Sequence, residues 1–528
     1  MTKKILALAI VLVLVLTASA SALELQSAGD TYPVDPSDIV ITYYSRDGLD
    51  PHDTYASWEE SPFHTNLIKQ TGINVQYIFP TAGADSTAFT NTLLADPANM
   101  PYIFKANLMD TAQDLLDRDV IWDLTPYLEE YAPAYYAFLK SNEAYDKAMK
   151  TDKGQYAYFG FFREDGGWND TYLGPVVRTD WLEECNLEIP TTVSEFENVI
   201  RVFNETYGAK FTFAWSRFQT TGISGAFGAY GASDMQFYVK DGEVSIAQYQ
   251  PEWRDYMSWL HQMWDEGLLD QDSLTETDTT IKTKVHDNKI GISITSMGQM
   301  NNWNLEEQAA GNEGTWIGIQ YPTGDDGTLS MVFGGPGIGD HTAAISKSAD
   351  EETMKLCLQL LDYAYTKEGF YFWNFGVQGE SWDFNADGEV EYLPEIQAEN
   401  AGVTDFTVKY GGTTWGGPCI QATKLLYLKN SQAAIDANDI WFYNNVDVTS
   451  AWKWPKGVTF TAAETDELSG MKSALSTFIT ESFANFISGA MDIDDDEVWD
   501  NYIATLEGMN IERVIEIYQG CYERYLER

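Results

Sequence analysis

The chain has 528 residues and carries 80 Asp and Glu against 32 Lys and Arg, a formal charge of −48. Hydrophobic residues make up 44% of the chain and aromatic residues 14%, which is the composition of a folded protein rather than a disordered one. The charge excludes a nucleic-acid backbone and an anionic membrane surface as partners, because both attract clustered Lys and Arg.

The first 22 residues predict an export signal. Lys3 and Lys4 precede the continuously apolar stretch Ile5–Leu16, and Ala20-Ser21-Ala22 offers a small-residue cleavage site. The apolar stretch is shorter than the roughly 20 residues of a membrane-spanning helix. No cysteine stands next to the cleavage site, so no thiol is available there for lipidation. We therefore expect an exported protein, at the extracellular face of the cell membrane or in the periplasm.

The first hundred residues of the mature chain alternate between strand and helix patterns. Strand-like runs at Ile39–Tyr44, Ile73–Ile78 and Tyr102–Phe104 alternate with helical stretches at Ser61–Thr71 and Thr87–Leu94. This order predicts an α/β fold with a mainly parallel sheet and helices on both faces.

Later helices are predicted from their start signals. The segments 192–195 and 348–351 have the Ser/Thr-x-x-Glu pattern of a capping box, and the helix from the second one is expected to stop at Gly369. The acidic run Asp492–Glu497 is expected at a helix start, where the helix dipole favours carboxylates. Asn510 is expected to cap the last helix.

The four cysteines stand far apart, at Cys185, Cys357, Cys419 and Cys521. Cys357 and Cys521 lie on apolar faces of helical patterns, which favours buried thiols. One or two disulfides remain an alternative, because export permits them.

No motif in the chain predicts a reaction. The five His residues show no zinc-binding spacing, and neither a phosphate loop nor a nucleophile elbow occurs. The glycine-rich segment Gly334–Gly339 fits a turn at a strand end better than a nucleotide site. With 80 carboxylates, some pair will lie at glycosidase spacing by chance, so composition cannot argue for hydrolysis.

One segment matches the start of a calcium loop. Asp383, Asn385 and Asp387 alternate before a glycine, and Glu389 adds a further carboxylate, but the twelfth position is Pro394 instead of Glu. The same residues are also typical of a hairpin turn between two strands. The segment could therefore be a hairpin turn or a calcium loop. We expect that the protein requires no cofactor, and calcium is the only bound ion that the sequence suggests.

Short segments along nearly the whole chain carry a family likeness. They are Asp123–Pro133 (DLTPYLEEYAP), Val177–Leu182 (VRTDWL), Leu187–Thr192 (LEIPTT), Glu266–Asp270 (EGLLD), Lys289–Gly291 (KIG), Glu368–Glu380 and Ile517–Tyr525. Together they resemble, in family order, the bacterial extracellular solute-binding proteins of the maltose-binding-like family 1. The chain is most similar to the long, oligosaccharide-binding branch of these ABC importer receptors.

The resemblance implies a two-lobed periplasmic-binding-protein fold of type II, with discontinuous α/β lobes joined by a hinge. The first lobe would comprise residues 37–169 plus 317–372, and the second residues 170–316 plus 373–528. An oligosaccharide would bind in the cleft and favour the closed form, which the membrane permease then recognises. We expect a monomer. Relatives often carry a calcium loop after the helix that ends near Phe203, but Asn204–Lys210 replaces it here.

A sugar site needs flat aromatic faces and polar groups of fixed geometry. The candidate platforms are tryptophans in loop-like contexts, each with core or hinge packing as the alternative: Trp58, Trp168, Trp215, Trp303 and Trp415. The candidate polar contacts are Arg46, Lys105 and Glu380.

Two other functions stay open. One is a secreted glycan-degrading hydrolase that uses a carboxylate pair, and the other is a receptor for peptides or another large solute. The acidic charge disfavours polyanionic ligands such as uronides, unless a local Arg and Lys pocket overrides it.

Overall fold

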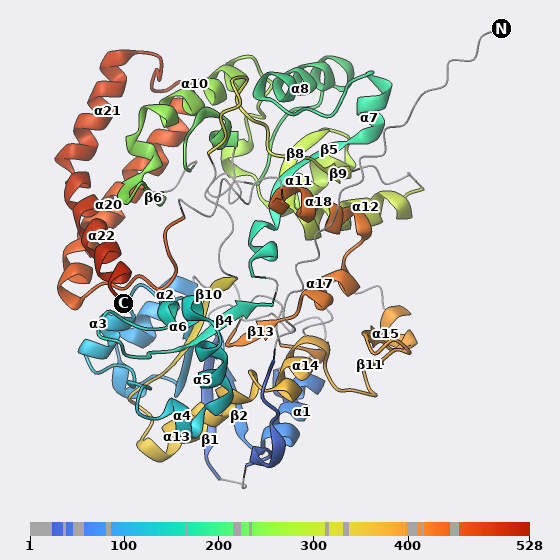
Figure 1. Cartoon of the computed structure of the whole chain (residues 1–528). Helices are drawn as coiled ribbons and strands as arrows, with labels where there is room; N and C mark the ends of the chain where they lie inside the picture. The colour runs from blue at the N-terminus through green and yellow to red at the C-terminus, as the bar shows by residue number, and fades with distance from the viewer. Residues whose placement is uncertain are drawn as a thin grey trace.

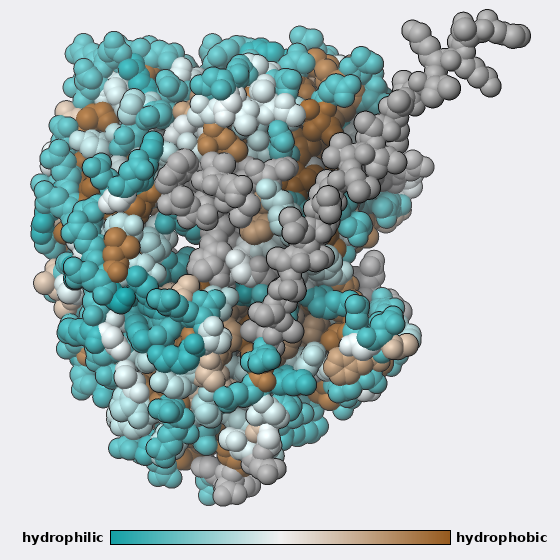
Figure 2. All heavy atoms as spheres, in the orientation of Figure 1, coloured by the Kyte–Doolittle hydropathy of each residue, from teal (hydrophilic) through white to brown (hydrophobic). Residues whose placement is uncertain are grey.

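The computed structural model describes residues 24–34, 38–45, 58–80, 86–164, 166–214, 223–231, 235–311, 316–330, 337–398, 409–412, 417–443 and 453–528. These residues form two α/β lobes, one above the other in Figure 1, each with its own sheet and hydrophobic core. The predicted export signal lies outside the described residues. None of the helices in the described ranges is both long and apolar enough to cross a membrane. On the face seen in Figure 2, hydrophilic side chains cover most of both lobes.

The first lobe is built on a six-stranded sheet with the order β13-β4-β10-β3-β1-β2. Its strands are β1 (Val40–Ser45), β2 (Asn74–Ile78), β3 (Ile103–Ala106), β4 (Phe159–Arg163), β10 (Ile338–Ile345) and β13 (Cys419–Gln421). All run parallel except β10, which is antiparallel to its neighbours β3 and β4. The predicted parallel sheet and its first three strands are confirmed.

Helices cover both faces of this sheet (Figure 1). The first, α1 (Pro62–Thr71), begins where the Ser61 side chain accepts a hydrogen bond from the backbone N–H of His64. It ends at Gly72, whose φ of 75° suits glycine. The other helices of this lobe are α2 (Ser86–Leu94), α3 (Ala112–Asp117), α4 (Leu128–Tyr131), α5 (Pro133–Lys140), α6 (Glu143–Ala148), α13 (Glu351–Tyr363), α14 (Lys367–Phe375) and α15 (Pro394–Ala398).

The single helix expected between residue 348 and Gly369 is wrong, because two helices stand there. The Asp350 side chain caps α13, which ends at Tyr363, and the Thr366 side chain caps α14. Gly369 lies in the first turn of α14, where a Cβ atom would come within 1.7 Å of the Tyr363 carbonyl oxygen. Glycine is therefore needed there for a close backbone approach and not as a helix stop.

The second lobe contains an antiparallel sheet in the order β8-β5-β9 and a separate hairpin, β6–β7. The strands are β5 (Leu173–Arg178), β6 (Phe237–Lys240), β7 (Glu243–Ile246), β8 (Ile292–Ser296) and β9 (Trp316–Gly318). The helices are α7 (Thr179–Glu184), α8 (Val193–Tyr207), α10 (Pro251–Asp265), α11 (Asp278–His286), α12 (Met297–Ala309), α18 (Gln432–Tyr443), α20 (Ala462–Ile487), α21 (Asp496–Gly508) and α22 (Ile511–Leu526).

Two of the three predicted helix starts in this lobe are confirmed. Thr192 and Glu195 form a reciprocal capping box at α8, and Asp495, within the acidic run, caps α21. Asn510 precedes α22 but has a φ of 66° and makes no capping hydrogen bond with its side chain. Its role is thus a left-handed turn between two helices, a conformation that Asn tolerates.

The predicted lobe boundaries need correction. The strand β13 pairs with β4, and Trp382, Tyr392 and Cys419 belong to the core of the first lobe. Residues 373–425 were assigned to the second lobe, but their strand and buried side chains belong to the first. Conversely, β9 and Ile319 belong to the second lobe and not to the first. The chain therefore passes between the cores after β4, before β10 and through α17 (Thr423–Lys429). The segment Lys453–Phe460 stays with the second lobe and contacts the first through the Phe460 N–H and the Asp110 carbonyl.

The cysteines are all free, as favoured by the sequence. Cys357, Cys419 and Cys521 are buried, and Cys185 is half-buried. Burial raises the pKa of each of the three buried thiols.

One side of the molecule is fastened by arginines of the last helix. Arg528 donates to the carboxylate of Asp152 in the first lobe at 2.5 Å and to the backbone carbonyls of Lys150 and Gly457. Arg524 contacts the same Asp152 at 2.8 Å and also Glu464 of α20 at 2.7 Å. Charge-assisted bonds of this kind are among the stronger ones in proteins.

Candidate functional site

The parallel strands of the first sheet all end at the edge that faces the second lobe (Figure 1). Arg163 ends β4, Gln421 ends β13 and Lys105 stands one residue before the end of β3, while β10 starts at the same edge. Ligands of open α/β sheets bind at the carboxyl ends of the strands. We therefore take this edge, together with the segments that cross to the second lobe, as the candidate site.

Basic and acidic side chains meet at this edge. Lys456 forms an ion pair with Asp340, the third residue of β10. The segment that carries Lys456 connects both lobes, since Lys453 forms a β-bridge with Tyr238 of β6 and the Phe460 N–H donates to the Asp110 carbonyl at 3.0 Å.

Solvent reaches both carboxylates at this edge. The Asp340 side chain is 49% exposed, and Asp110 is also exposed. Nevertheless, burial raises the pKa of Asp110, and the cations Lys472 and Lys456 only partly oppose this.

The charges at this edge act on one another. Burial would raise the pKa of Asp340, but Lys456 and Lys453 lower it below its usual value. Burial, followed by repulsion from Lys456, lowers the pKa of Lys453 to about 7. Asp340 opposes this shift and Arg163 adds to it.

Trp168, a predicted platform, lies in the short 3-10 helix η4 (Trp168–Thr171) at the crossing after β4. Its ring is buried, its Nε1–H donates to Asp439 at 2.7 Å, and it stacks on Tyr427 with ring centroids 5.6 Å apart. Tyr427 of α17 is 46% exposed. The aromatic face that solvent reaches at this crossing is thus Tyr427, backed by Trp168.

The other predicted side chains are dispersed. Trp303 lies inside the second lobe on α12, is 1% exposed and packs against Trp316, so its ring offers no face to a ligand in this structure. Lys105 is buried in β3, and Glu380 is exposed in the turn before β11 (Trp382–Phe384). Arg46, Trp215 and Trp415 lie outside the described residues, as does the side chain of Trp58, the first residue of η2 (Trp58–Glu60).

Sequence reasoning missed Tyr427, Arg163, Asp340, Lys453 and Lys456. One sequence signal was available for the two lysines, since Trp452-Lys453-Trp454-Pro455-Lys456-Gly457 interleaves basic and aromatic residues before a turn. Tyr427 stands in an ordinary helical pattern and carries no such signal.

The predicted hairpin turn is confirmed: Asn385–Glu389 connects β11, which includes Asp383, to β12 (Val390–Tyr392). Asn385 Oδ1 accepts bonds from the N–H groups of Asp387 and Glu389 at 3.0 and 2.9 Å. Gln378 donates to Asp383 at 2.8 Å, and Lys424 pairs with Glu389 at 2.9 Å. These bonds account for the turn, and calcium binding by Asp383, Asn385, Asp387 and Glu389 stays a prediction.

A different acidic group could share a cation within the described part of the chain: Asp270, Asp272 and Glu276. The ammonium group of Lys284 already lies among them, 2.7 Å from Asp270 and 3.1 Å from Asp272, and it also pairs with Glu276. The protein's own amine therefore neutralises this group.

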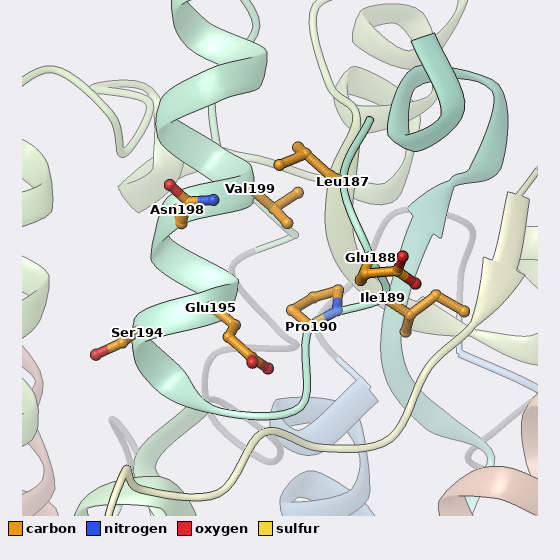
Figure 3. A pocket seen from close by; sticks show the side chains of 8 residues that line it. All are labelled: Leu187, Glu188, Ile189, Pro190, Ser194, Glu195, Asn198 and Val199. Carbon is orange, nitrogen blue, oxygen red and sulfur yellow. The ribbon is translucent and has the colours of Figure 1, made fainter. Parts of the chain in front are cut away.

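A small pocket of 320 Å³ lies on the second lobe, between the first turns of α8 and the loop before it (Figure 3). Its lining includes Leu187, Ile189, Pro190 and Glu195. The Glu195 carboxylate is engaged with Thr191 and with the capping box of α8. We attribute this pocket to the helix start and not to ligand binding.

No family model matches the sequence. FusA of Streptococcus pneumoniae, a fructooligosaccharide ABC transporter substrate-binding protein, is 20% identical over 525 residues, which cover 94% of this chain and 92% of FusA. The polygalacturonan/rhamnogalacturonan-binding protein YtcQ of Bacillus subtilis is 23% identical over 52% of this chain. The chain spans little more than half the length of two curated relatives that it matches, 58% and 56%.

Solved structures match over almost the full length. The alginate-binding protein AlgQ2 covers 92% of this chain and 97% of its own, with a TM-score of 0.75 and 19% identity. FusA in complex with kestose covers 93% of this chain and 100% of its own, with a TM-score of 0.69 and 18% identity. The fold is that of the two-lobed solute-binding proteins. The predicted α/β periplasmic-binding-protein fold and the resemblance to ABC importer receptors are thereby confirmed.

Calcium is associated with both neighbours. The AlgQ2 structure is one without calcium ion, and another FusA structure carries an EF-hand mutation. Among the residues that the structure describes, the acidic group that could hold a cation is the one that Lys284 fills.

Proposed function

We propose that the protein is the extracellular substrate-binding subunit of an ABC importer, which captures an oligosaccharide between its lobes and does not cleave it. The observation that carries this proposal is the carboxyl edge of the first sheet, which faces the second lobe where the chain crosses between them. The substrate-binding role of the relatives, fructooligosaccharide for FusA, supports it.

A ligand in this position contacts both lobes only when they close, so its binding energy favours the closed conformation. The membrane permease would then recognise that closed form. Calcium, if it binds, has its proposed site at the β11–β12 turn.

The sugar contacts would combine stacking with polar bonds. Tyr427 offers an exposed ring, and the bond between Trp168 and Asp439 fixes the ring behind it. C–H faces of sugars pack on such rings, and the hydroxyl rim requires fixed donors and acceptors. The sequence-derived contacts that remain part of the proposal are Arg46, Trp58, Lys105, Trp215, Glu380 and Trp415.

Binding is tested by calorimetry with neutral oligosaccharides such as kestose, and closure by small-angle scattering with and without the sugar. Replacing Tyr427→Ala should weaken binding about tenfold, the upper range for a stacking contact. Tyr427→Phe should stay within about twofold, because the ring remains. Tyr443→Ala, at a 64% exposed tyrosine of α18, serves as the matched control.

The hydrolase alternative predicts glycan cleavage that depends on a pair of carboxylates. Asp110 and Asp340 are two carboxylates near this edge whose pKa values are displaced in opposite directions, as an acid and a base would require. Glycan cleavage that survives repurification and disappears in Asp110→Asn or Asp340→Asn would refute the receptor. The receptor function predicts that the wild type, Asp110→Asn and Asp340→Asn all leave the glycan uncleaved.

A further inference from the structure

An exposed aromatic ring on the first lobe is held in place by two others. Phe384, the last residue of β11, is 43% exposed and lies nearly perpendicular to the rings of Tyr371 and Trp382, with centroids 5.6 and 5.1 Å away. Tyr371 stacks on Trp382 at 5.1 Å, and the Trp382 Nε1–H donates to the Gly376 carbonyl at 3.0 Å. Single exposed apolar side chains are common on proteins, but this ring belongs to an ordered cluster that solvent reaches.

Polar side chains stand beside this ring. Gln378 donates to Asp383 at 2.8 Å, and both residues are exposed. Glu380, a sequence-derived sugar contact, is exposed in the turn before β11, and its carboxylate makes no hydrogen bond or ion pair with the described part of the chain. A sugar ring, with apolar C–H faces and a rim of hydroxyls, requires this combination of aromatic surface and polar groups.

The β11–β12 hairpin is continuous with the candidate site through α17. Figure 1 shows the hairpin beside α14 and below α17. β12 packs against α17, and Lys424 of that helix pairs with Glu389 of the hairpin turn at 2.9 Å. Lys424 and Tyr427 stand three positions apart and so share one face of the helix. One helical turn, about 5 Å, and the length of a lysine side chain therefore separate Tyr427 from the hairpin turn.

A second link joins the ring cluster to the end of β4. Burial and the carboxylate of Glu164, the residue after β4, raise the pKa of Tyr371. Glu164 also accepts from the N–H of Thr423, the first residue of α17, at 3.0 Å. The cluster is thus connected on two sides to the edge that forms the candidate site.

We propose that Phe384, supported by Tyr371 and Trp382 and flanked by Glu380, is an outer subsite for one sugar ring of an oligosaccharide whose inner rings lie at Tyr427. The inference rests on the proposed function and adds a determinant of chain length to the same site. Because the hairpin lies more than a helical turn away from Tyr427, the rings of a short ligand stay at Tyr427 and only a longer ligand reaches Phe384.

The geometry and the charge of this surface favour a neutral sugar ring. The contacts with Tyr371 and Trp382 already restrict the rotation of the Phe384 side chain, so little conformational entropy is lost when a ligand packs on it. The formal charge of −48 and the exposed carboxylates of Glu380 and Asp383 oppose an acidic partner here. The same carboxylates can accept hydrogen bonds from sugar hydroxyls.

The experiment measures affinity against chain length by calorimetry, with trisaccharides and pentasaccharides of the fructo-, malto- and xylo-oligosaccharide series. In a series that binds, the pentasaccharide should bind up to about tenfold more tightly than the trisaccharide, the upper range for one stacking contact. Phe384→Ala should remove most of this difference and leave the affinity for the trisaccharide unchanged. Phe384→Tyr should keep the difference because the ring remains, and Glu380→Ala should reduce it by about threefold.

Two comparisons serve as controls. Tyr443→Ala, at the 64% exposed tyrosine of α18, should change neither affinity. Tyr427→Ala should weaken both lengths, because this ring contacts the inner part of the ligand. The trisaccharide affinity of Phe384→Ala also reports that this variant is folded.

Equal affinity for the two lengths, or an equal loss for both in Phe384→Ala, would refute the outer subsite and leave the receptor function standing. A dimer in sedimentation that Phe384→Ala dissociates would assign the ring to an interface between two copies of the chain and would likewise refute the subsite. If no series binds at either length or closes the lobes, the proposed function itself fails.

Discussion

A buried carboxylate on α13 should make the first lobe less stable as the pH rises. Asp362 is 1% exposed, and its Oδ1 accepts the backbone N–H of Tyr135 at 2.7 Å. The Tyr32 hydroxyl donates to Oδ2 at 3.4 Å and to the Gln359 carbonyl at 2.7 Å. Burial outweighs these bonds and raises the pKa of Asp362 from 3.8 to about 7.

The sign follows from proton binding. Between pH 3.8 and about 7 the folded protein keeps the Asp362 proton that the unfolded chain releases, so the free energy of unfolding falls as pH rises through this window. The shift of about three pH units corresponds to roughly 4 kcal/mol at 1.36 kcal/mol per unit. Above the folded pKa the loss is complete and stability no longer depends on this group.

The test is Asp362→Asn. Asparagine keeps Oδ1 as the acceptor for Tyr135, and its Nδ2 can donate to the Tyr32 hydroxyl oxygen. Urea unfolding should show the stability of the variant relative to wild type rising by roughly 4 kcal/mol from pH 4 to 8. Asp350→Asn, at the cap of the same helix, is the control: bonds to Thr353 lower the pKa of Asp350 below its usual 3.8, so its stability difference from wild type should stay constant from pH 4 to 8. A difference between Asp362→Asn and wild type that does not vary with pH would refute the argument.

Two other predictions concern the acidic group and the thiols. Lys284→Met should destabilise the second lobe by roughly 3–5 kcal/mol, because it leaves Glu276, whose side chain is 2% exposed, without its cation. Calcium should then raise the melting temperature of this variant, because the ion can take the place of the Lys284 amine among the three carboxylates. An unchanged melting temperature with calcium would contradict this interpretation. A thiol reagent should modify only Cys185 in the native protein and all four cysteines after denaturation without reductant. Fewer than four in the denatured chain would reveal a disulfide.

The sequence predicted what local patterns determine and failed where distant segments meet. The strands β1 to β3 alternate clearly with helices, so their order could be predicted. The strand β13 has three residues and becomes a strand only because β4 lies beside it, which explains the misplaced lobe boundary. Trp303 stands in a polar context, Asn301-Asn302-Trp303-Asn304, but α12 turns that ring into the core.

The candidate site was less predictable than the fold for the same reason. Trp168 was predicted in a loop-like context and lies at the crossing after β4, but Tyr427, 259 positions further along the chain, covers it and presents the exposed ring. Arg163, Asp340 and Lys456 come from three separate segments, and their neighbourhood is a product of tertiary structure.

The arginine bonds to Asp152 have a consequence for the order of events during capture. They fasten the lobes at the side of α22 (Figure 1). If the lobes open as the proposed function requires, we expect a rotation with its axis near these bonds, in which displacement grows with distance from them. Arg528 also holds Gly457, the neighbour of Lys456, so the pair with Asp340 lies close to the axis and keeps its geometry in the open form. The part of the site around Tyr427, on α17, lies farther away and is completed last. A ligand bound between the lobes would thus complete its contacts around Tyr427 last, in a sequence that rapid-mixing fluorescence would resolve into two phases.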